Sequence, residues 1–137
     1  MALIVVLAGC SVLEAGLAGS ALVTKEEPVA GQPGGDRFPD VLAVELSSTG
    51  DRVFDVAVTL SSPYDTPQRY ADGWRVLDPD GEVLGTHTLM HDHASEQPFT
   101  RHQRGLLIPA GIDEVTVEGR DQANGFGGLT VTVTVPQ

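Results

Sequence analysis

Apolar and polar residues alternate along the chain after Phe38, and this alternation is its clearest pattern. Within Val53–Ser61 the even positions hold Phe, Val, Val and Leu, while the odd positions include Asp and Thr. Within Val131–Val135 valines alternate with threonines in the same way. Successive side chains of a β-strand point to opposite faces, so a period of two predicts strands that are buried on one side.

Seven β-strands follow from this pattern and from the turn residues between its segments. Gly, Pro, Asn, Asp and Ser mark turns at Ser48–Asp51, Asp78–Gly81 and Asn124–Gly125. No stretch has helical spacing long enough to cross over between parallel strands. The predicted strands are Val41–Ser47, Arg52–Ser61, Arg69–Asp78, Glu82–Met90, Arg104–Ile108, Glu114–Arg120 and Leu129–Val135.

Seven short strands at a spacing of roughly 8–12 residues are typical of an all-β, immunoglobulin- or fibronectin-like β-sandwich. Trp74 falls on the third strand, where such folds often bury an aromatic side chain. A small β-barrel is the alternative. The length of 137 residues leaves room for one domain. Cys10 is the single cysteine, which excludes an internal disulfide and a cysteine-based metal centre.

The N-terminus has the character of a targeting segment. Its apolar run ends at Cys10 and is far shorter than the ~20 residues that span a bilayer as a helix. Leu7-Ala8-Gly9-Cys10 resembles the lipobox of bacterial lipoproteins. No Lys or Arg precedes the run, so we expect a true start codon upstream. The alternative is an ordinary N-terminal segment with no targeting role.

The lipobox resemblance implies a domain organisation and a location. Residues 1–9 would be a signal peptide, and Cys10 would become the lipidated first residue of the mature protein. Two acyl chains would anchor it stably, with palmitate among them. Residues 10–36, rich in Ala, Gly, Pro and acidic residues, are expected to form a flexible tether. Residues 37–137 would form a β-sandwich outside the cytoplasm, at the periplasmic face or cell surface.

The charge balance argues against several classes of partner. Eight basic residues against 19 acidic ones give a formal net charge of −11. An acidic surface repels phosphate backbones and anionic headgroups, so we expect neither nucleic-acid binding nor polybasic membrane docking. The same charge favours cations as ligands.

Histidines supply the one candidate chemical site. Three of the four histidines fall within seven residues, from His87 to His93. If Glu82–His93 is extended, His91 and His93 lie on one face, about 6.6–6.8 Å apart at Cα, and can converge on one ion. We therefore predict a transition-metal site for copper or zinc, because imidazole suits both. Its predicted ligands are His91, His93, Glu96 and His102. The alternative is a solvated strand end whose histidines bond to carboxylates.

The segment His91–Phe99 has the pattern H-x-H-x-x-E-Q-P-F, and Tyr70–Trp74 precedes it. Together they resemble a small family of uncharacterised secreted bacterial proteins, over about Arg69 to Gly128. That resemblance supports the importance of this stretch and implies no activity.

Three functions remain open from the sequence. The first is a membrane-anchored lipoprotein that binds copper or zinc. The second is a non-catalytic interaction or assembly module of the cell envelope, with an envelope protein as partner. The third is an enzyme, which we do not expect. Hydrolase chemistry in particular has no positive support, since no nucleophile signature such as G-x-S-x-G is present.

Overall fold

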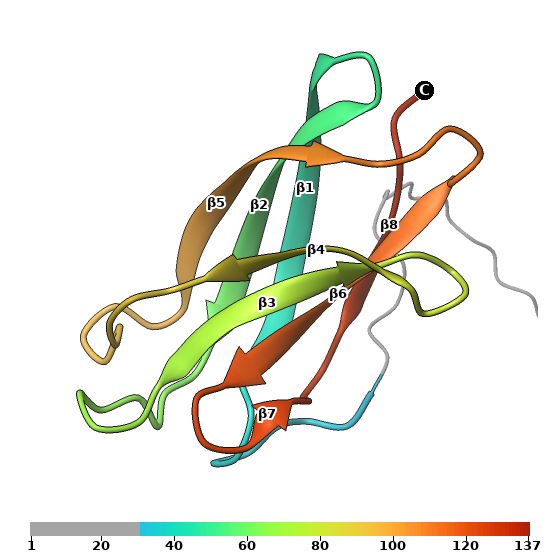
Figure 1. Cartoon of the computed structure of the whole chain (residues 1–137). Helices are drawn as coiled ribbons and strands as arrows, with labels where there is room; N and C mark the ends of the chain where they lie inside the picture. Colours follow the sequence, from blue (N-terminus) through green and yellow to red (C-terminus); the bar gives the residue numbers. More distant parts are fainter. Residues whose placement is uncertain (1–30) are drawn as a thin grey trace, which may run out of the picture.

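A computed structural model describes residues 31–137, which form two antiparallel β-sheets packed face to face (Figure 1). The predicted signal peptide, Cys10 and most of the predicted tether lie outside the described residues. Within residues 31–137 no helix is long and apolar enough to cross a membrane. The strands are β1 (Asp40–Gly50), β2 (Val53–Ser61), β3 (Ala71–Leu77), β4 (Val83–Thr88), β5 (Phe99–Leu107), β6 (Glu114–Asp121), β7 (Gly125–Phe126) and β8 (Val131–Thr134).

The pairing of the strands confirms the predicted sandwich. One sheet has the order β1-β2-β5, and the other has β4-β3-β6, with β7 and β8 both paired to β6. The sheets do not close into a barrel. In constant-type immunoglobulin domains the fourth strand joins the sheet of the first, second and fifth. Here β4 pairs with β3 instead. The pairing of β4 with β3 therefore sets this domain apart from that type.

Most strands begin and end close to their predicted positions, with three differences. The predicted strand Glu82–Met90 ends at Thr88. β5 begins at Phe99, five residues before the predicted Arg104. The two-residue strand β7 was not predicted, because a segment of two residues is too short to show a period of two.

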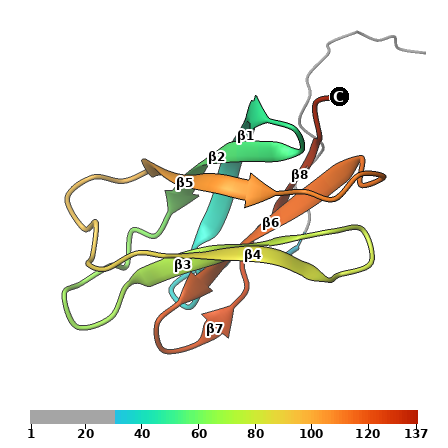
Figure 2. The same cartoon turned by 45° about the horizontal axis from the view of Figure 1, so that its top comes forward.

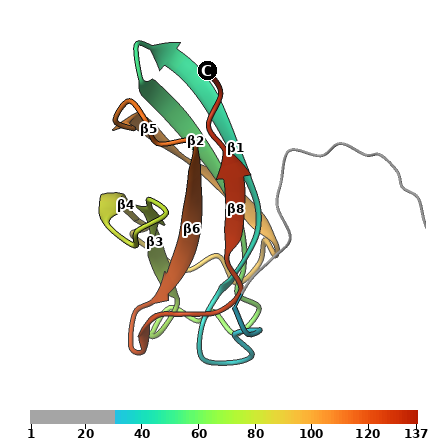
Figure 3. The same cartoon turned by 90° about the vertical axis from the view of Figure 1, so that its right-hand side faces the viewer.

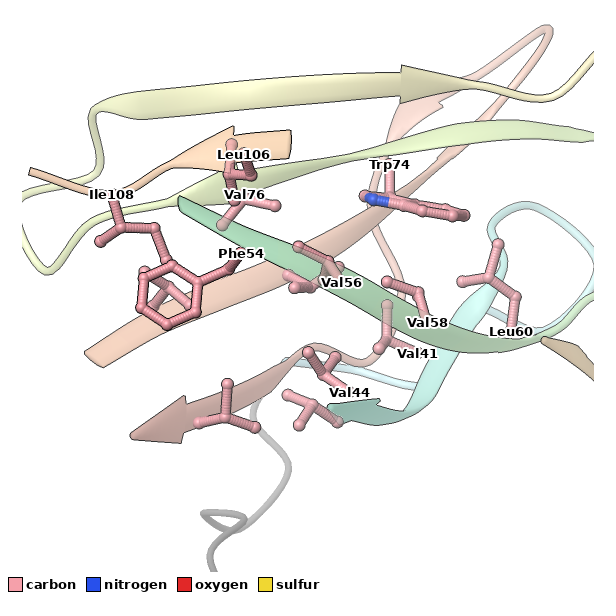
Figure 4. Packing of buried hydrophobic residues seen from close by; sticks show 14 of the residues in the cluster. Val41, Val44, Phe54, Val56, Val58, Leu60, Trp74, Val76, Leu106 and Ile108 are labelled. Atoms are coloured by element: carbon pink, nitrogen blue, oxygen red, sulfur yellow. The ribbon is translucent and has the colours of Figure 1, made fainter. Parts of the chain in front are cut away.

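The period-two residues fill the space between the sheets (Figure 4). All four even positions of β2, from Phe54 to Leu60, are buried, and so are the alternating valines of β6 and β8. Trp74 is 1% exposed and belongs to this core, as the sequence predicted. Each such side chain contributes roughly 1.5–3 kcal/mol by leaving water. The alternation along the strands is therefore what holds the two layers together.

A short segment before β1, residues 31–39, packs against one end of the sandwich. The Asp40 Oδ1 atom accepts hydrogen bonds from the backbone N–H of Gly34 (2.7 Å) and of Leu129 (2.8 Å). The N–H of Val41 also donates to the carbonyl of Leu129, which brings β1 beside the start of β8 (Figure 3). The ring of Phe38 lies directly over Gly127, where no side chain would fit. Residues 31–39 therefore already contact the sandwich before β1 begins.

Candidate functional site

Two loops meet at one end of the sandwich, and they carry the motifs singled out in the sequence (Figures 1 and 2). Residues 89–98, here called the histidine loop, connect β4 to β5. Residues 62–70 connect β2 to β3. The Tyr70 hydroxyl donates to the carbonyl of Met90 (3.3 Å), and the N–H of Leu89 donates to the carbonyl of Asp72 (2.9 Å). The histidine loop is therefore fixed to the start of β3.

His91 and His93 lie in the histidine loop, not on a strand, so the predicted common strand face is wrong. The reason is that β4 ends at Thr88. Their rings nevertheless come together, with centroids 4.7 Å apart and planes tilted by 38°. His93 is 4% exposed and stacks on Phe99, with centroids 4.0 Å apart. His91 is exposed, and its Nδ1 atom lies 2.8 Å from the carbonyl oxygen of Asp92.

The His93 side chain contributes mainly by packing against Phe99 and not by hydrogen bonding. Its Nδ1 atom is buried and has no hydrogen-bond partner. Burial lowers the pKa of His93, and the positive charge of Arg101 and the neighbouring His91 lower it further. The folded environment therefore favours the neutral form of the ring. A neutral imidazole can bind a metal ion, but here it also completes the stack on Phe99.

A buried carboxylate, Asp65, and a glutamine, Gln97, hold the histidine loop against the other loop. Asp65 Oδ1 accepts the N–H of Ala71 (3.0 Å), and Oδ2 accepts the N–H of His93 (3.0 Å). Gln97 Oε1 accepts the N–H of Ser62 (2.6 Å), and its Nε2 atom donates to the carbonyl of His93 (3.0 Å). Both side chains form hydrogen bonds with backbone groups of the loops. They satisfy amides that have no partner strand there.

The other two predicted metal ligands do not complete a group of three ligands with the histidine pair. Glu96 forms an ion pair with Arg101 (2.6 Å), which lowers the pKa of its carboxyl. His102 is exposed on β5 and lies opposite Ala57 of β2. Since its neighbour Gln103 points into the core, His102 points to the outer face of the sheet. Among residues 31–137, no group of three or more His, Cys, Asp or Glu side chains is placed to hold a metal ion.

His87 has a separate environment on β4. It lies opposite Trp74 of β3, and the two rings stack with centroids 4.5 Å apart. Burial lowers the pKa of His87 as well. The histidines at the two ends of the sequence cluster thus pack on different aromatic side chains.

A second buried carboxylate, Asp121, organises the adjacent β6–β7 turn. It accepts hydrogen bonds from Arg69 Nε (3.1 Å) and from the N–H groups of Ala123 (2.9 Å) and Asn124 (2.8 Å). The buried hydroxyl of Tyr64 lies near it without reaching ordinary hydrogen-bond geometry. Burial raises the pKa of Tyr64, and the negative charge of Asp121 raises it further. For Asp121 burial acts against ionisation, but these donors outweigh it and lower its pKa.

The burial of Asp65 and Asp121 could not be predicted from the sequence. Each is a single acidic residue among polar neighbours in or beside a turn, as a solvent-exposed aspartate would be.

The turn at Asp78–Glu82 is a tight hairpin turn, as expected, with Asp78 Oδ1 accepting the N–H groups of Asp80 and Glu82.

The domain is thus a two-sheet β-sandwich whose loop end is built from internally bonded polar side chains. It is similar to a protein of Halomicrobium mukohataei named "Putative lipoprotein", with 39% identity over 97 residues. The match covers 71% of this chain and 47% of that protein, so the chain spans about half the length of this relative. The chain matches no family model and no solved structure.

Proposed function

We propose that this protein is a lipoprotein, anchored through Cys10, that displays its β-sandwich outside the cytoplasm. The observation that carries the proposal is the 39% identity to a protein named as a lipoprotein, together with Leu7-Ala8-Gly9-Cys10 in this chain. The first observation is a likeness over 97 residues, and the second is a motif of four residues near the N-terminus. Two acyl chains on Cys10 would supply stable membrane anchoring.

The proposed role of the domain is non-catalytic interaction or assembly at the cell envelope. The support for this role is that the polar side chains at the loop end of the sandwich bond to other parts of the chain. Asp65 and Gln97 bond to loop backbone, Glu96 bonds to Arg101, and Asp121 bonds to Arg69 and its own turn. A catalytic site needs groups poised toward a substrate. These groups are instead directed to neighbouring parts of the chain, which suits a rigid displayed surface.

Substitution of Cys10 in the full native reading frame tests the anchor. Cys10→Ser removes the thiol that would receive the diacylglyceryl group. This variant should therefore leave the membrane fraction or accumulate unprocessed, and it should incorporate no labelled palmitate. Ser11→Ala is the matched control and should fractionate like the wild type. A Cys10→Ser protein that remains in the membrane at its mature size would contradict the anchor.

A second candidate function is copper or zinc binding at His91 and His93, which the 4.7 Å separation of their rings favours. His91 is the better position for substitution, because His93 also packs on Phe99 and its loss would affect the fold. Calorimetric titration of the wild type should show binding that His91→Ala removes and that His102→Ala leaves intact. Copper(II) should bind more tightly than zinc, on the general order of affinities. Equal titrations of wild type and His91→Ala would exclude this site.

A further inference from the structure

Asn124 is the one asparagine in the 137-residue sequence, and Gly125 follows it directly. It lies at the tip of the turn between β6 and β7, where its side chain is exposed. Gly125 has a φ of 87°, in the left-handed region, and its missing side chain leaves the Gly125 nitrogen sterically open. An exposed carboxamide beside an unhindered backbone nitrogen can react with it to close a five-membered ring.

The Asn124 side chain connects this turn to the segment that enters the domain. Its Nδ2 atom donates to the carbonyl of Arg37 (3.1 Å) and to Asp121 Oδ2 (3.1 Å). Arg69, which Asp121 also holds, donates to the carbonyl of Asp36. Figure 1 shows the β6–β7 turn beside the segment that leads into β1. Two side chains fixed by one buried carboxylate therefore hold residues 36 and 37 in place.

We propose that Asn124 is a site of spontaneous deamidation, and that its conversion to aspartate or isoaspartate releases residues 31–39 from the end of the sandwich. The Gly125 nitrogen forms a bond to Cγ of Asn124, and the Cγ–Nδ2 bond breaks. Ammonia leaves and carries away the proton of the Gly125 amide. Water then adds to one of the two carbonyl carbons of the resulting imide. The ring opens to aspartate or, with the backbone rerouted through Cγ, to isoaspartate.

The electrostatics of the product explain the release. The Nδ2 donor is replaced by an oxygen that cannot donate to the carbonyl of Arg37 or to Asp121. A new negative charge then stands within hydrogen-bond distance of the Asp121 carboxylate, which is fully buried. Like charges at this distance repel, and the carbonyl of Arg37 loses its partner. Isoaspartate adds an extra backbone atom, which changes the length of the turn that Asp121 organises.

Intact-mass measurement of the full chain during incubation at mildly alkaline pH tests the chemistry. Exchange of –NH2 for –OH adds about 1 Da, and we expect this gain in the peptide that contains Asn124. Asp80-Gly81 can also form an imide, but the isoaspartate formed there has the same mass as aspartate, so the mass gain does not report on that site. Asn124→Gln, which does not close a five-membered ring, should show no gain over the same period. A constant wild-type mass, while a peptide of residues 120–128 gains about 1 Da, would overturn the proposal.

Hydrogen exchange tests the consequence. The N–H groups of Arg37 and Phe38 donate to the carbonyl of Gly34 within the docked segment. In Asn124→Asp, which carries the product's charge without incubation, these two amides should exchange about tenfold faster than in the wild type. Amides in the centre of β2 are the internal control and should not change. Equal exchange of Arg37 and Phe38 in wild type and Asn124→Asp would overturn the release of the segment.

Discussion

The indole Nε1 atom of Trp74 on β3 donates a 2.8 Å hydrogen bond to Oε1 of Gln103 on β5, deep between the two sheets. The Nε2 atom of the same glutamine donates to the carbonyl of Thr86 on β4 (3.2 Å). One side chain from the three-stranded sheet thus satisfies two polar groups of the other sheet. A buried donor without a partner costs free energy, so this pair fixes how the two layers sit at the β4–β5 corner.

Gln103→Leu should therefore destabilise the domain by about 1–3 kcal/mol, because the Trp74 N–H would lose its acceptor while remaining buried. Trp74→Ala should cost more, roughly 3–5 kcal/mol, through lost packing. Urea unfolding measures both. A double-mutant cycle of Trp74→Phe with Gln103→Leu should give a coupling of about 0.5–3 kcal/mol. Additive effects would mean that the two side chains do not depend on each other.

His93 should make the stability of the domain depend on pH. Burial lowers the pKa of His93 and of His87, so the unfolded chain binds protons that the folded chain does not. The free energy of unfolding should then be highest above about pH 6.5 and should fall as the pH drops below that value. Urea titrations across this range measure it.

His93→Phe is the matched variant for that measurement. Phenylalanine keeps the stack on Phe99 and removes a buried nitrogen that has no partner. Its free energy of unfolding at neutral pH should equal or exceed that of the wild type, and it should fall less steeply on acidification. A variant that is several kcal/mol less stable at neutral pH would show that the imidazole has a bonding role.

The strands could be predicted because the alternation that marks them is local in the sequence. The arrangement of the two loops at the end of the sandwich could not be predicted in this way. The alternation in β2 and β8 is visible in the sequence, and burial of Trp74 followed from its place on β3. The histidine pair was expected on a strand face, yet β4 stops at Thr88 and the loop brings the rings together differently. The position of His93 depends on its hydrogen bond to Asp65, which lies 28 residues away in the sequence. Periodicity carries no information about such a long-range bond.

Asp65→Asn tests how far one carboxylate organises the two loops. Asp65 is 4% exposed and accepts one backbone N–H at each oxygen. Asparagine has the same shape but only one accepting oxygen, so one N–H would face the amide nitrogen. We expect a loss of about 1–3 kcal/mol in the free energy of unfolding, with faster hydrogen exchange at His93 or Ala71. Asp92→Asn, at a half-exposed position in the same loop, should change stability by less than about 0.5 kcal/mol.

Asp40→Ala tests whether the segment before β1 is part of the folded domain. Its Oδ1 atom accepts the N–H groups of Gly34 and Leu129, and so ties the entering chain to the connection between β7 and β8. Without it, both amides lose their acceptor, and we expect a loss of about 1–3 kcal/mol in the free energy of unfolding. Hydrogen exchange at Gly34 and Leu129 should accelerate together. Asp51→Ala, at an exposed position in the β1–β2 turn, is the control for removing one negative charge from an acidic domain and should change stability by less than about 0.5 kcal/mol. If the two variants are equally stable, the segment rests on the sandwich without contributing to its stability.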